Sequence, residues 1–430
     1  MKIRKIEASS NEMLEFLEFN YSSLKDYEAS VIEIGRQVKA RGDQAIFDFC
    51  RKFDGAAVNE KNFQVTEDEI AEAYEKVSGE YVDALTRAVQ NIAFYHYKQK
   101  KNSWMEPDER GNILGQIYRP LERVGIYVPG GTAAYPSSVL MNAIPAQVAG
   151  VKEIAMVSPP GNDGKLNPYT LVAAAEIGLT EIYKMGGAQA IFALAWGTET
   201  VRRVDLISGP GNIYVTIAKK MVYGDVNIDM LAGPSEILII ADSKADPAYL
   251  AADMMSQAEH DVLARSILVT DAPALIDLVE KEIERQIAGL SRKDIIAQSL
   301  ENNGAFILAA DMDEACEVAN RVAPEHLELM VENPFAFLSK IRNAGAIFLG
   351  EYTPEPVGDY FAGPNHILPT GGTARFYSPV SVDTFMKTSS VVYYSPEGIE
   401  QDAEDIMKLA LVEGLTAHAN SIKVRYDKKR

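Results

Sequence analysis

Hydrophobic residues in one early part of the chain recur at a helical spacing. Between about Val65 and Lys101 they return every three or four residues, which places them on one face of a helix. These positions are Ile70, Ala73, Val77, Tyr81, Leu85, Val89, Ile92 and Phe94. The pattern predicts that this region is helical.

Beyond Gly111 the pattern changes to short runs rich in β-branched residues, separated by helical patterns such as LVAAAEIG and NIYVTIAKKMVYG. The runs are VGIYV, EIAMV, EIYKM, VDLI, EILIIA, SILVT, GAFILAA, LELMV and AGAIFLG. They show little polar alternation, which is typical of strands buried on both faces. A mostly parallel α/β sheet is therefore predicted. After about Ser378 the pattern is irregular and then helical, which indicates a small C-terminal unit.

Glycine-containing turns follow four of the predicted strands, and we expect them to open helices. They are VPGGTAAYPSS, MGGAQA, SGPGNIY and, less cleanly, LAGPSE. Glycine lets backbone N–H groups approach a ligand closely, and a helix N-terminus favours negative charge. Such turns gather along one edge of an open sheet, where ligands bind. However, α/β proteins need tight turns in any case, and none of the four matches G-x-G-x-x-G, so the pattern alone does not establish a dinucleotide site.

Composition narrows the functional classes. The 430 residues predict two or three domains, and 47% hydrophobic with 24% charged residues is typical of a folded protein. Sixty-one acidic against 42 basic side chains leave a net charge of −19, which disfavours nucleic acid and membrane surfaces as partners. Two cysteines, Cys50 and Cys316, cannot build a disulfide framework or a thiolate metal cage, and no signal peptide is evident. We expect a cytoplasmic protein.

Two short segments combine residues that can bind a metal or move a proton. In SQAEHD, Gln257 and His260 are three residues apart in a helical pattern, so both can point toward a common site. In VAPEHLELM, Glu325 and His326 follow Pro324, and in irregular backbone this pair could activate water and accept a proton. Taken alone, a helix surface and a solvated strand start explain the two pairs as well.

Further candidates lie toward the C-terminus. Asp359 and His366 belong to PEPVGDYFAGPNH, a segment rich in proline and glycine that can fold over a site as a loop. His418 follows Glu413 by five residues in a helical pattern, where a surface histidine is the alternative. His96 stands at an aromatic and basic helix end, and we interpret it as structural.

Eight segments, taken together, identify a family. They are RVGIYVPGGTAAYPSSVLMNAIPAQVAGV, GGAQAIFALAWGT, DLISGPGNIYVTIAKK, DMLAGPSEILIIAD, SQAEHD, APEHLEL, PVGDYFAGPNHILPT and EGLTAHA. In these residues and in their order, the chain resembles histidinol dehydrogenase over essentially its whole length. Because eight ordered segments are highly specific, the resemblance favours the functional interpretation of the residues above.

The resemblance implies an α/β fold with two Rossmann-like, mostly parallel sheet domains that carry helices on both faces, plus small helical N- and C-terminal extensions. We expect an N-terminal extension over residues 1–24. A first α/β domain would combine 25–110 with 236–377, and a second, inserted one would span 111–235. Residues 378–430 would form a small C-terminal domain involved in dimerisation.

The resemblance also implies a zinc enzyme that oxidises L-histidinol to L-histidine through the aldehyde with two NAD molecules in succession, the last step of histidine biosynthesis. The implied zinc ligands are Gln257, His260, Asp359 and His418. The implied substrate contacts are these four residues with Ser235, His326, His366 and Glu413. The implied NAD contacts are Tyr127, Gln189 and Asn212, which come from the glycine-rich turns.

The implied mechanism assigns two roles to neighbouring residues. His326 is expected to remove the proton of the alcohol, and Glu325 to activate the water that hydrates the aldehyde. The cysteines lie outside the segments named above, which favours a hydrated intermediate over a thiohemiacetal. His418 and Glu413 are expected to reach the site of a partner chain, so that a homodimer shares its active sites.

Three other functions stay open at this point. A related zinc and NAD dehydrogenase could act on another small alcohol. A zinc amidohydrolase would use the same ligands with Glu325 as its water activator, and it would need no nucleotide. A non-catalytic α/β binding protein would use the glycine turns for its ligand but would tolerate the loss of His326.

Overall fold

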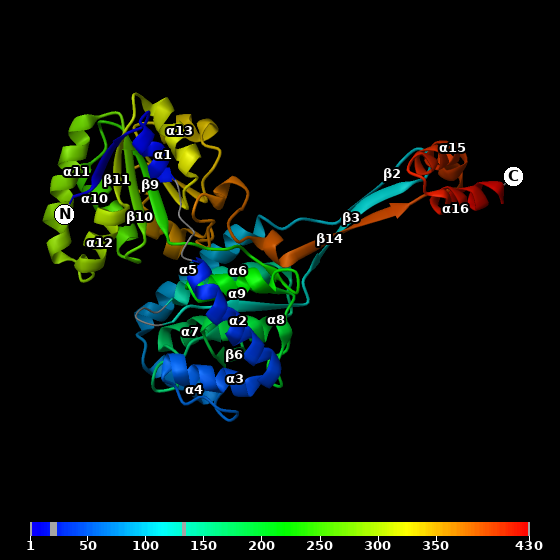
Figure 1. The fold of residues 1–430 in the computed structure, drawn as a ribbon, viewed down its shortest axis with the longest axis horizontal. Helices are drawn as coiled ribbons and strands as arrows, with labels where there is room; N and C mark the ends of the chain where they lie inside the picture. Colours follow the sequence, from blue (N-terminus) through cyan, green and yellow to red (C-terminus); the bar gives the residue numbers. More distant parts are fainter. Residues whose placement is uncertain (1, 18–23, 131–134, 429–430) are drawn as a thin grey trace. The chain divides into compact units, whose positions relative to one another are not determined.

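The chain folds into two units, shown in the computed structural model of Figure 1. The large unit comprises Met1–Gln99 and Leu121–Phe385, and the small unit comprises Lys100–Pro120 and Met386–Arg430. Within them the structure describes residues 2–17, 24–130 and 135–428. No helix in these described ranges is long and apolar enough to cross a membrane.

The first sheet of the large unit has six parallel strands in the order β1-β11-β10-β9-β12-β13. The strands are β1 (Arg4–Glu7), β9 (Glu236–Ala241), β10 (Arg265–Thr270), β11 (Ala305–Leu308), β12 (His326–Met330) and β13 (Ala346–Leu349). Its helices are α1 (Asn11–Leu17), α10 (Pro247–Ala258), α11 (Pro273–Gln286), α12 (Lys293–Asn303) and α13 (Met312–Val322). The N-terminal segment thus adds an edge strand as well as a helix.

Strand β9 shows why this sheet has a core on each face. Ile237 and Ile239 pack with α10, α11 and α12, whereas Leu238 and Ile240 pack with α13 on the other side. Figure 1 shows the two helix layers on either side of the strands. Successive side chains of a strand point to opposite faces, so a strand covered on both sides is apolar at every position.

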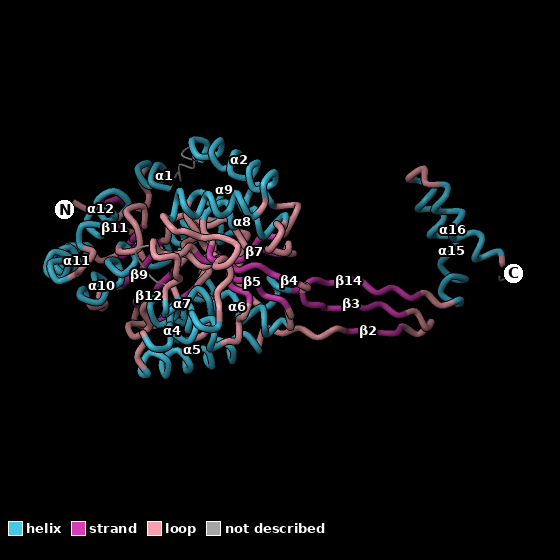
Figure 2. Tube along the Cα trace, turned by 90° about the horizontal axis from the view of Figure 1, so that it is seen from below, coloured by secondary structure: helices cyan, strands magenta, loops and turns pink. Residues whose placement is uncertain are grey.

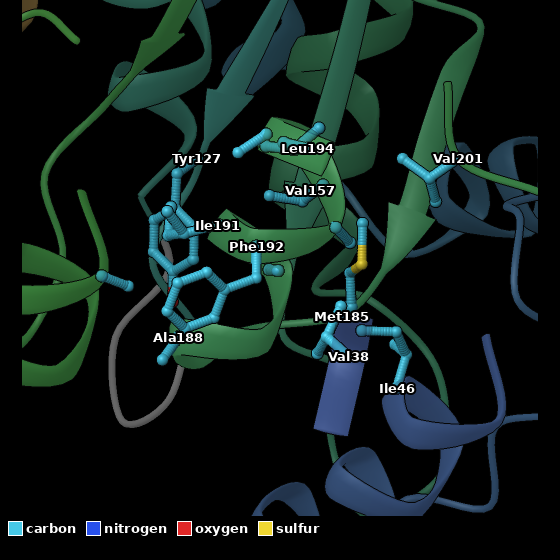
Figure 3. Packing of buried hydrophobic residues seen from close by; sticks show 14 of the residues in the cluster. Val38, Ile46, Tyr127, Val157, Met185, Ala188, Ile191, Phe192, Leu194 and Val201 are labelled. Atoms are coloured by element: carbon cyan, nitrogen blue, oxygen red, sulfur yellow. The ribbon is translucent and has the colours of Figure 1, made fainter. Parts of the chain in front are cut away.

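The second sheet has five parallel strands in the order β6-β5-β4-β7-β8. The strands are β4 (Arg123–Tyr127), β5 (Glu153–Ser158), β6 (Glu181–Lys184), β7 (Leu206–Ser208) and β8 (Asn227–Ile228). Its helices are α2 (Leu24–Arg41), α3 (Asp43–Phe49), α6 (Pro136–Ala149), α7 (Pro168–Glu176), α8 (Gly187–Trp196) and α9 (Ile213–Val222). Figure 2 shows α2, α8 and α9 on one side of the strands, with α6 and α7 on the other. Figure 3 shows part of the core of this sheet, including Tyr127 of β4 and Ile191 and Phe192 of α8.

The predicted helical region is confirmed as two helices, α4 (Glu67–Glu75) and α5 (Gly79–Tyr97). Thr66 and Glu69 form a reciprocal capping box that starts α4, and Ser78 caps α5. His96 is fully buried near the end of α5, where its Nδ1 donates to the carbonyl of Ile92 at 2.8 Å. It serves as a structural residue there.

Two of the four glycine turns open helices within the described residues. MGGAQA leads into α8 and SGPGNIY leads into α9, whereas the helix after VPGGTAAYPSS begins only at Pro136, beyond the undescribed residues 131–134. The prediction for LAGPSE was wrong, because this segment joins β8 of the second sheet to β9 of the first. The chain crosses between sheets there, and no helix follows.

The small unit contains an antiparallel sheet that the sequence analysis did not predict. Its strands, in the order β14-β3-β2, are β2 (Trp104–Pro107), β3 (Ile113–Pro120) and β14 (Met386–Tyr393). The helices α15 (Pro396–Val412) and α16 (Thr416–Asp427) pack against each other at one end of this ribbon, as Figure 1 shows. The predicted C-terminal helical region is confirmed by these two helices.

Candidate active site

The acid–base pair lies at the amino end of strand β12. His326 is the first residue of the strand, and Glu325 lies in the bend before it. Just upstream, Ala323 ends α13 in a left-handed conformation with φ 51°. Nδ1 of His326 is 3.7 Å from Oε2 of Glu325, and both side chains are buried. The expectation of irregular backbone therefore holds for Glu325 but not for His326.

The backbone of a neighbouring strand fixes the tautomer of His326. Nδ1 donates to the carbonyl oxygen of Glu236 at 3.1 Å, whereas Nε2 is buried without a hydrogen-bond partner and lies 3.6 Å from Oδ1 of Asp359. Burial opposes a charge on this ring, but the surrounding carboxylates of Glu325, Glu355 and Asp359 outweigh it and raise the His326 pKa well above its usual value. In the neutral ring the proton is on Nδ1, which donates to the backbone carbonyl, so Nε2 is the nitrogen that can accept a proton from a bound molecule.

Glu325 is a buried carboxyl group poised to exchange its proton near neutral pH. Burial raises its pKa to about 8, against the opposing effects of His326 and a backbone hydrogen bond. The N–H of Glu236 donates to Oε2 of Glu325 at 2.9 Å. A carboxyl group with such a pKa can act as general base or acid, because both of its protonation states are accessible.

The predicted metal ligands of the large unit come from two segments. Gln257 is buried at the end of α10, and His260 follows one turn later, its N–H donating to the carbonyl of Gln257 at 3.2 Å. Asp359 lies in the π-helical turn η5 (Gly358–Ala362). Burial lowers the His260 pKa, and burial would raise the Asp359 pKa, but the nearby imidazoles of His326, His366 and His260 lower it. A neutral imidazole and an ionised carboxylate are the forms that bind metals.

Glu355 belongs to the same cluster, although sequence reasoning missed it. Within the described residues, His326, Glu355 and Asp359 offer ligand atoms that all lie within 4.8 Å of one another. Burial raises the Glu355 pKa to about 7. The segment was interpreted as a loop, yet it forms α14 (Glu355–Val357) and then η5, so that Glu355 and Asp359 share one helical face. Their four-residue spacing after Pro354 was the available signal.

Ser235 and His366 border this cluster. Ser235 directly precedes β9, and its carbonyl accepts the N–H of Arg265 at 3.0 Å. His366 donates from Nδ1 to the carbonyl of Asp359 at 3.0 Å, and burial lowers its pKa, so its Nε2 can accept. His366 and Asp359 also line a cavity of about 560 Å³.

Glu413 and His418 belong to the small unit. Glu413 follows the last residue of α15, and His418 lies in the first turn of α16, with Gly414 turning the chain between the helices at φ 74°. Both side chains are exposed. Both side chains can therefore contact a ligand or a partner protein at the junction of α15 and α16.

A second, larger cavity lies at the carboxyl ends of the second sheet. Tyr127, Gln189 and Asn212 all line it, and its volume is about 1230 Å³. The Tyr127 hydroxyl accepts the N–H of Gly187 at 3.0 Å, and burial raises its pKa to about 12. Asn212 caps α9 through its side-chain oxygen, which accepts from two backbone N–H groups. The structure thus brings the three predicted NAD contacts to one cavity.

This cavity suits an anionic ligand. The N-terminal turns of α8 and α9 face it and provide its anion-attracting feature, because the lining side chains balance, with Arg41, Lys52 and Lys165 against Glu33, Asp54 and Asp163. Helix N-termini present unpaired N–H groups and a positive dipole end. A molecule with phosphate groups fits such a lining.

A buried ion pair holds the turn before α9 in place. Lys219 and Asp229 form this pair with almost no exposure to solvent. Lys219 also donates to the carbonyl of Gly209 at 3.0 Å, and Asp229 accepts the N–H of Gly209 at 2.8 Å. Gly209 has φ 120°, and a Cβ there would overlap the carbonyl oxygen of Tyr127. The close approach of these two backbone segments requires glycine.

The fold and the site define an α/β enzyme with a buried acid–base centre. A sequence model of the histidinol dehydrogenase family matches residues 18–426. The chain is 61% identical over 398 residues to a histidinol dehydrogenase of Heliobacterium mobile, with 93% of each chain covered. It is 56% identical over 403 residues to one of Geobacter sulfurreducens, covering 93% of this chain and 94% of the relative.

Solved structures give the same result. The crystal structure of histidinol dehydrogenase from Elizabethkingia anophelis matches with a TM-score of 0.95 and 38% identity, covering 99% of this chain and 98% of that one. The chain belongs to the histidinol dehydrogenase family, which catalyses the final step of histidine biosynthesis. It is an oxidoreductase, so the hydrolase and the binding protein are excluded, and the predicted family and fold class are confirmed.

Proposed function

We propose that this enzyme oxidises L-histidinol to L-histidine through histidinaldehyde, with zinc bound at the first sheet and two NAD molecules consumed in succession. The observation that carries the proposal is His326, whose Nδ1 is anchored to a backbone carbonyl while Nε2 stays buried without a partner beside Asp359. This arrangement presents one basic nitrogen to a bound alcohol. Family membership supports the choice of substrate.

The donor set fits zinc. Gln257 offers an amide oxygen, His260 an imidazole nitrogen and Asp359 a carboxylate oxygen, and we propose His418 as the fourth ligand. The low pKa of His260 and Asp359 keeps both groups in their metal-binding forms. Zinc, when bound, would hold nitrogen atoms of the substrate and fix its orientation. We assign Ser235, His366 and Glu413 as further substrate contacts.

His326 and Glu325 divide the proton transfers. In the first oxidation, Nε2 of His326 would take the hydroxyl proton of the alcohol, and NAD in the large cavity would supply the hydride acceptor, so that the aldehyde is left. Glu325 would then remove a proton from water as the water adds to the aldehyde carbon, and protonated His326 would return its proton to the former carbonyl oxygen, which gives the hydrate and frees Nε2. In the second oxidation, His326 would take a hydroxyl proton of the hydrate, and a second NAD would supply the hydride acceptor, so that the carboxylic acid is left. Four electrons leave the substrate in total.

We place NAD in the large cavity of the second sheet. Tyr127, Gln189 and Asn212 line this cavity, and the N-termini of α8 and α9 suit a pyrophosphate. Gly186 and Gly209 allow backbone segments near this cavity to lie close together. A Cβ at Gly186 would overlap Pro159, and one at Gly209 would overlap Tyr127. These contacts support a nucleotide without the usual dinucleotide fingerprint.

The aldehyde is processed without a covalent enzyme adduct. Burial raises the Cys50 pKa to about 12 and also raises the Cys316 pKa, so neither thiol is a ready nucleophile. We therefore expect the double variant Cys50→Ala/Cys316→Ala to keep most of its kcat once folding is verified by circular dichroism. Loss of most activity in a folded variant would contradict the hydrated intermediate. The buried free thiols also support a cytoplasmic location.

The small unit supports a homodimer with shared active sites. Its helices expose several large apolar side chains, namely Leu409, Leu411, Val412, Leu415 and Val424. Such surface favours association, and Glu413 and His418 lie on the same two-helix element. We propose that a second copy of the chain contributes these two residues to the site.

Subunit exchange tests the shared site. His418→Ala and Asp359→Ala chains are each expected to be inactive alone. In a mixed dimer both lesions fall in one site and the other site is intact, so exchange should restore about half of the wild-type activity per mixed dimer. No recovery, although mixed dimers are demonstrated by mass spectrometry, would argue against sharing.

A spectrophotometric assay tests the whole proposal. We expect L-histidinol to yield two NADH per molecule, and we expect a chelator to stop the reaction until zinc is restored. A panel of other amino alcohols provides the comparison, since a related zinc and NAD dehydrogenase acting on another small alcohol is the second candidate. Faster turnover of another alcohol, with little NADH from histidinol, would select that candidate.

A further inference from the structure

Glu355 is a buried carboxylate next to the proposed zinc ligands, and the mechanism above gives it no task. Its side chain is 2% exposed, and one carboxylate oxygen lies 3.8 Å from Nε2 of His260. Its backbone N–H donates to Oε1 of Glu328 at 2.9 Å, which fixes the first residue of α14 to strand β12. The carboxylate is therefore held in one position by backbone as well as by packing.

The partner of this carboxylate is the amide of Gln257. With its nitrogen facing Glu355, the amide donates to both carboxylate oxygens, at 3.0 and 3.2 Å. The opposite orientation would place the amide oxygen against two acceptors. Because Gln257 is fully buried, water cannot compensate for that mismatch. The amide oxygen must then point away from Glu355.

We infer that Glu355 is a positioning residue that holds the Gln257 amide by two hydrogen bonds and thereby turns its oxygen toward the metal. The inference rests on the proposed zinc site. Carboxylates commonly orient metal-binding histidines, and here we propose that a carboxylate orients a metal-binding amide in the same way. A glutamine without such a partner would present its nitrogen as readily as its oxygen, and the nitrogen cannot ligate a cation.

A competing role for Glu355 is direct ligation, since its oxygens lie near those of Asp359 and Nε2 of His326. Glu355 cannot have both roles, because they require opposite orientations of the Gln257 amide relative to the cation. If Glu355 ligated the cation, its two hydrogen bonds would turn the amide nitrogen toward the same centre. The roles also differ in a measurable way, because an orienting residue acts only through the residue that it orients.

A double-mutant cycle on zinc affinity separates these roles. Zinc dissociation constants of the full-length protein are measured by competition with a chromophoric chelator for the wild type, Glu355→Ala, Gln257→Ala and the double variant. We expect Glu355→Ala to weaken zinc binding roughly 10- to 100-fold. In the Gln257→Ala background, the same change should weaken it by less than about twofold, because the cycle isolates the coupling of the pair.

Glu355→Gln separates hydrogen bonding from charge. Its amide oxygen can still accept from Gln257, so we expect a smaller loss than in Glu355→Ala, and this variant also serves if Glu355→Ala fails to fold. Glu351→Ala, an exposed acid on the same segment, should leave zinc affinity unchanged. Thermal unfolding of the metal-free proteins verifies that the variants fold.

Three results would overturn the inference. Equal weakening by Glu355→Ala in both backgrounds would mark Glu355 as a ligand or a simple charge. Unchanged affinity in Glu355→Ala would show that Gln257 needs no orienting partner. A wild-type protein that binds no zinc would remove the inference together with the proposed metal site, whereas zinc binding with an additive cycle removes the inference alone.

Discussion

The two parallel sheets of the large unit place their candidate sites at opposite ends of their strands. In the first sheet, Ser235, Glu325 and His326 stand at or just before the amino ends of β9 and β12, and Gln257 lies in the last turn of α10. In the second sheet, the cavity with Tyr127 lies at the carboxyl ends, where α8 and α9 begin. Helices α10 and α13 therefore end at the first site, whereas α8 and α9 begin at the second.

This difference decides which ligand charge each site favours. A helix C-terminus carries a partial negative charge and favours cations, whereas a helix N-terminus offers N–H groups and favours anions. The first site accordingly gathers buried carboxyl and imidazole groups, for which we propose cation binding and proton transfer, while the second includes glycine turns and two helix N-termini. The same parallel α/β architecture thus offers one edge for the proposed metal, at the first sheet, and one edge for the proposed nucleotide, at the second sheet.

The largest effect is expected from the buried ion pair behind the second site. Lys219→Met leaves Asp229 buried without its counter-charge, and we expect the free energy of unfolding to fall by about 3–5 kcal/mol. Urea denaturation measures it. Lys220→Met, at the exposed neighbouring position, is the control, and Lys219→Met/Asp229→Asn should recover part of the loss. A cost under about 1 kcal/mol would show that the pair does not support the turn.

The first site should respond in catalysis rather than in stability. His326→Ala is expected to lower kcat roughly 10²- to 10³-fold, because it removes the proton acceptor, while NAD affinity measured by fluorescence titration stays near that of the wild type. Glu332→Gln, an exposed acid after β12, is the control. If NAD binding fell along with kcat, the two sites would not be separable as described.

Glycine at the second site can be tested with a matched pair. Gly209 and Gly224 both have positive φ, at 120° and 109°, but a Cβ would overlap Tyr127 only at position 209. We expect Gly224→Ala to cost about 1 kcal/mol from backbone strain and Gly209→Ala at least about 2 kcal/mol more from the overlap. Thermal unfolding compares them. Equal costs would mean that the backbone contact gives way easily.

The smallest effect concerns Asp54, whose carboxyl group lines the large cavity of the second sheet. Burial raises the Asp54 pKa from 3.8 to about 6, so the folded chain holds a proton that the unfolded chain releases. The raised pKa therefore lowers the free energy of unfolding. This loss grows between about pH 4 and pH 6 and is constant above pH 6, because the unfolded state binds fewer protons than the folded state in that window. Asp54→Asn should therefore stabilise the ligand-free protein by about 1 kcal/mol at pH 7.5 after allowance for solvent screening, and not at pH 4.

Urea denaturation at the two pH values measures the effect of Asp54→Asn. The exposed Asp271→Asn serves as its control and should change stability equally at both. A stabilisation by Asp54→Asn that does not depend on pH would contradict titration as its cause.

Much of the fold could be predicted because its signals are local. Strands such as Glu236–Ala241 are apolar at every position after the first, and helices such as Glu67–Glu75 carry their caps in the adjacent sequence. The antiparallel ribbon was missed because β14 pairs with β3, from which it is separated by more than half of the chain. The exposed faces of these strands give no periodic signal that distinguishes them from loops.

The candidate site shows the same limit at the level of single residues. Local pattern and family resemblance named His326, Gln257 and Asp359, whose chemistry is recognisable in short segments. Glu355 escaped notice because a glutamate between two prolines resembles an ordinary loop residue. Its importance appears only where the chain brings it against the amide of Gln257.

The sequence by itself determined the family, the two-sheet α/β class and the residue types available for chemistry, because these are recorded in contiguous segments and their order. Only the tertiary structure decided that the acid–base pair lies at amino ends and the large cavity at carboxyl ends, which nitrogen of His326 is free, and which carboxylate faces Gln257. Those properties depend on distances between residues remote in the chain. Burial then sets their proton affinities, since the cost of a charge is fixed by what surrounds it.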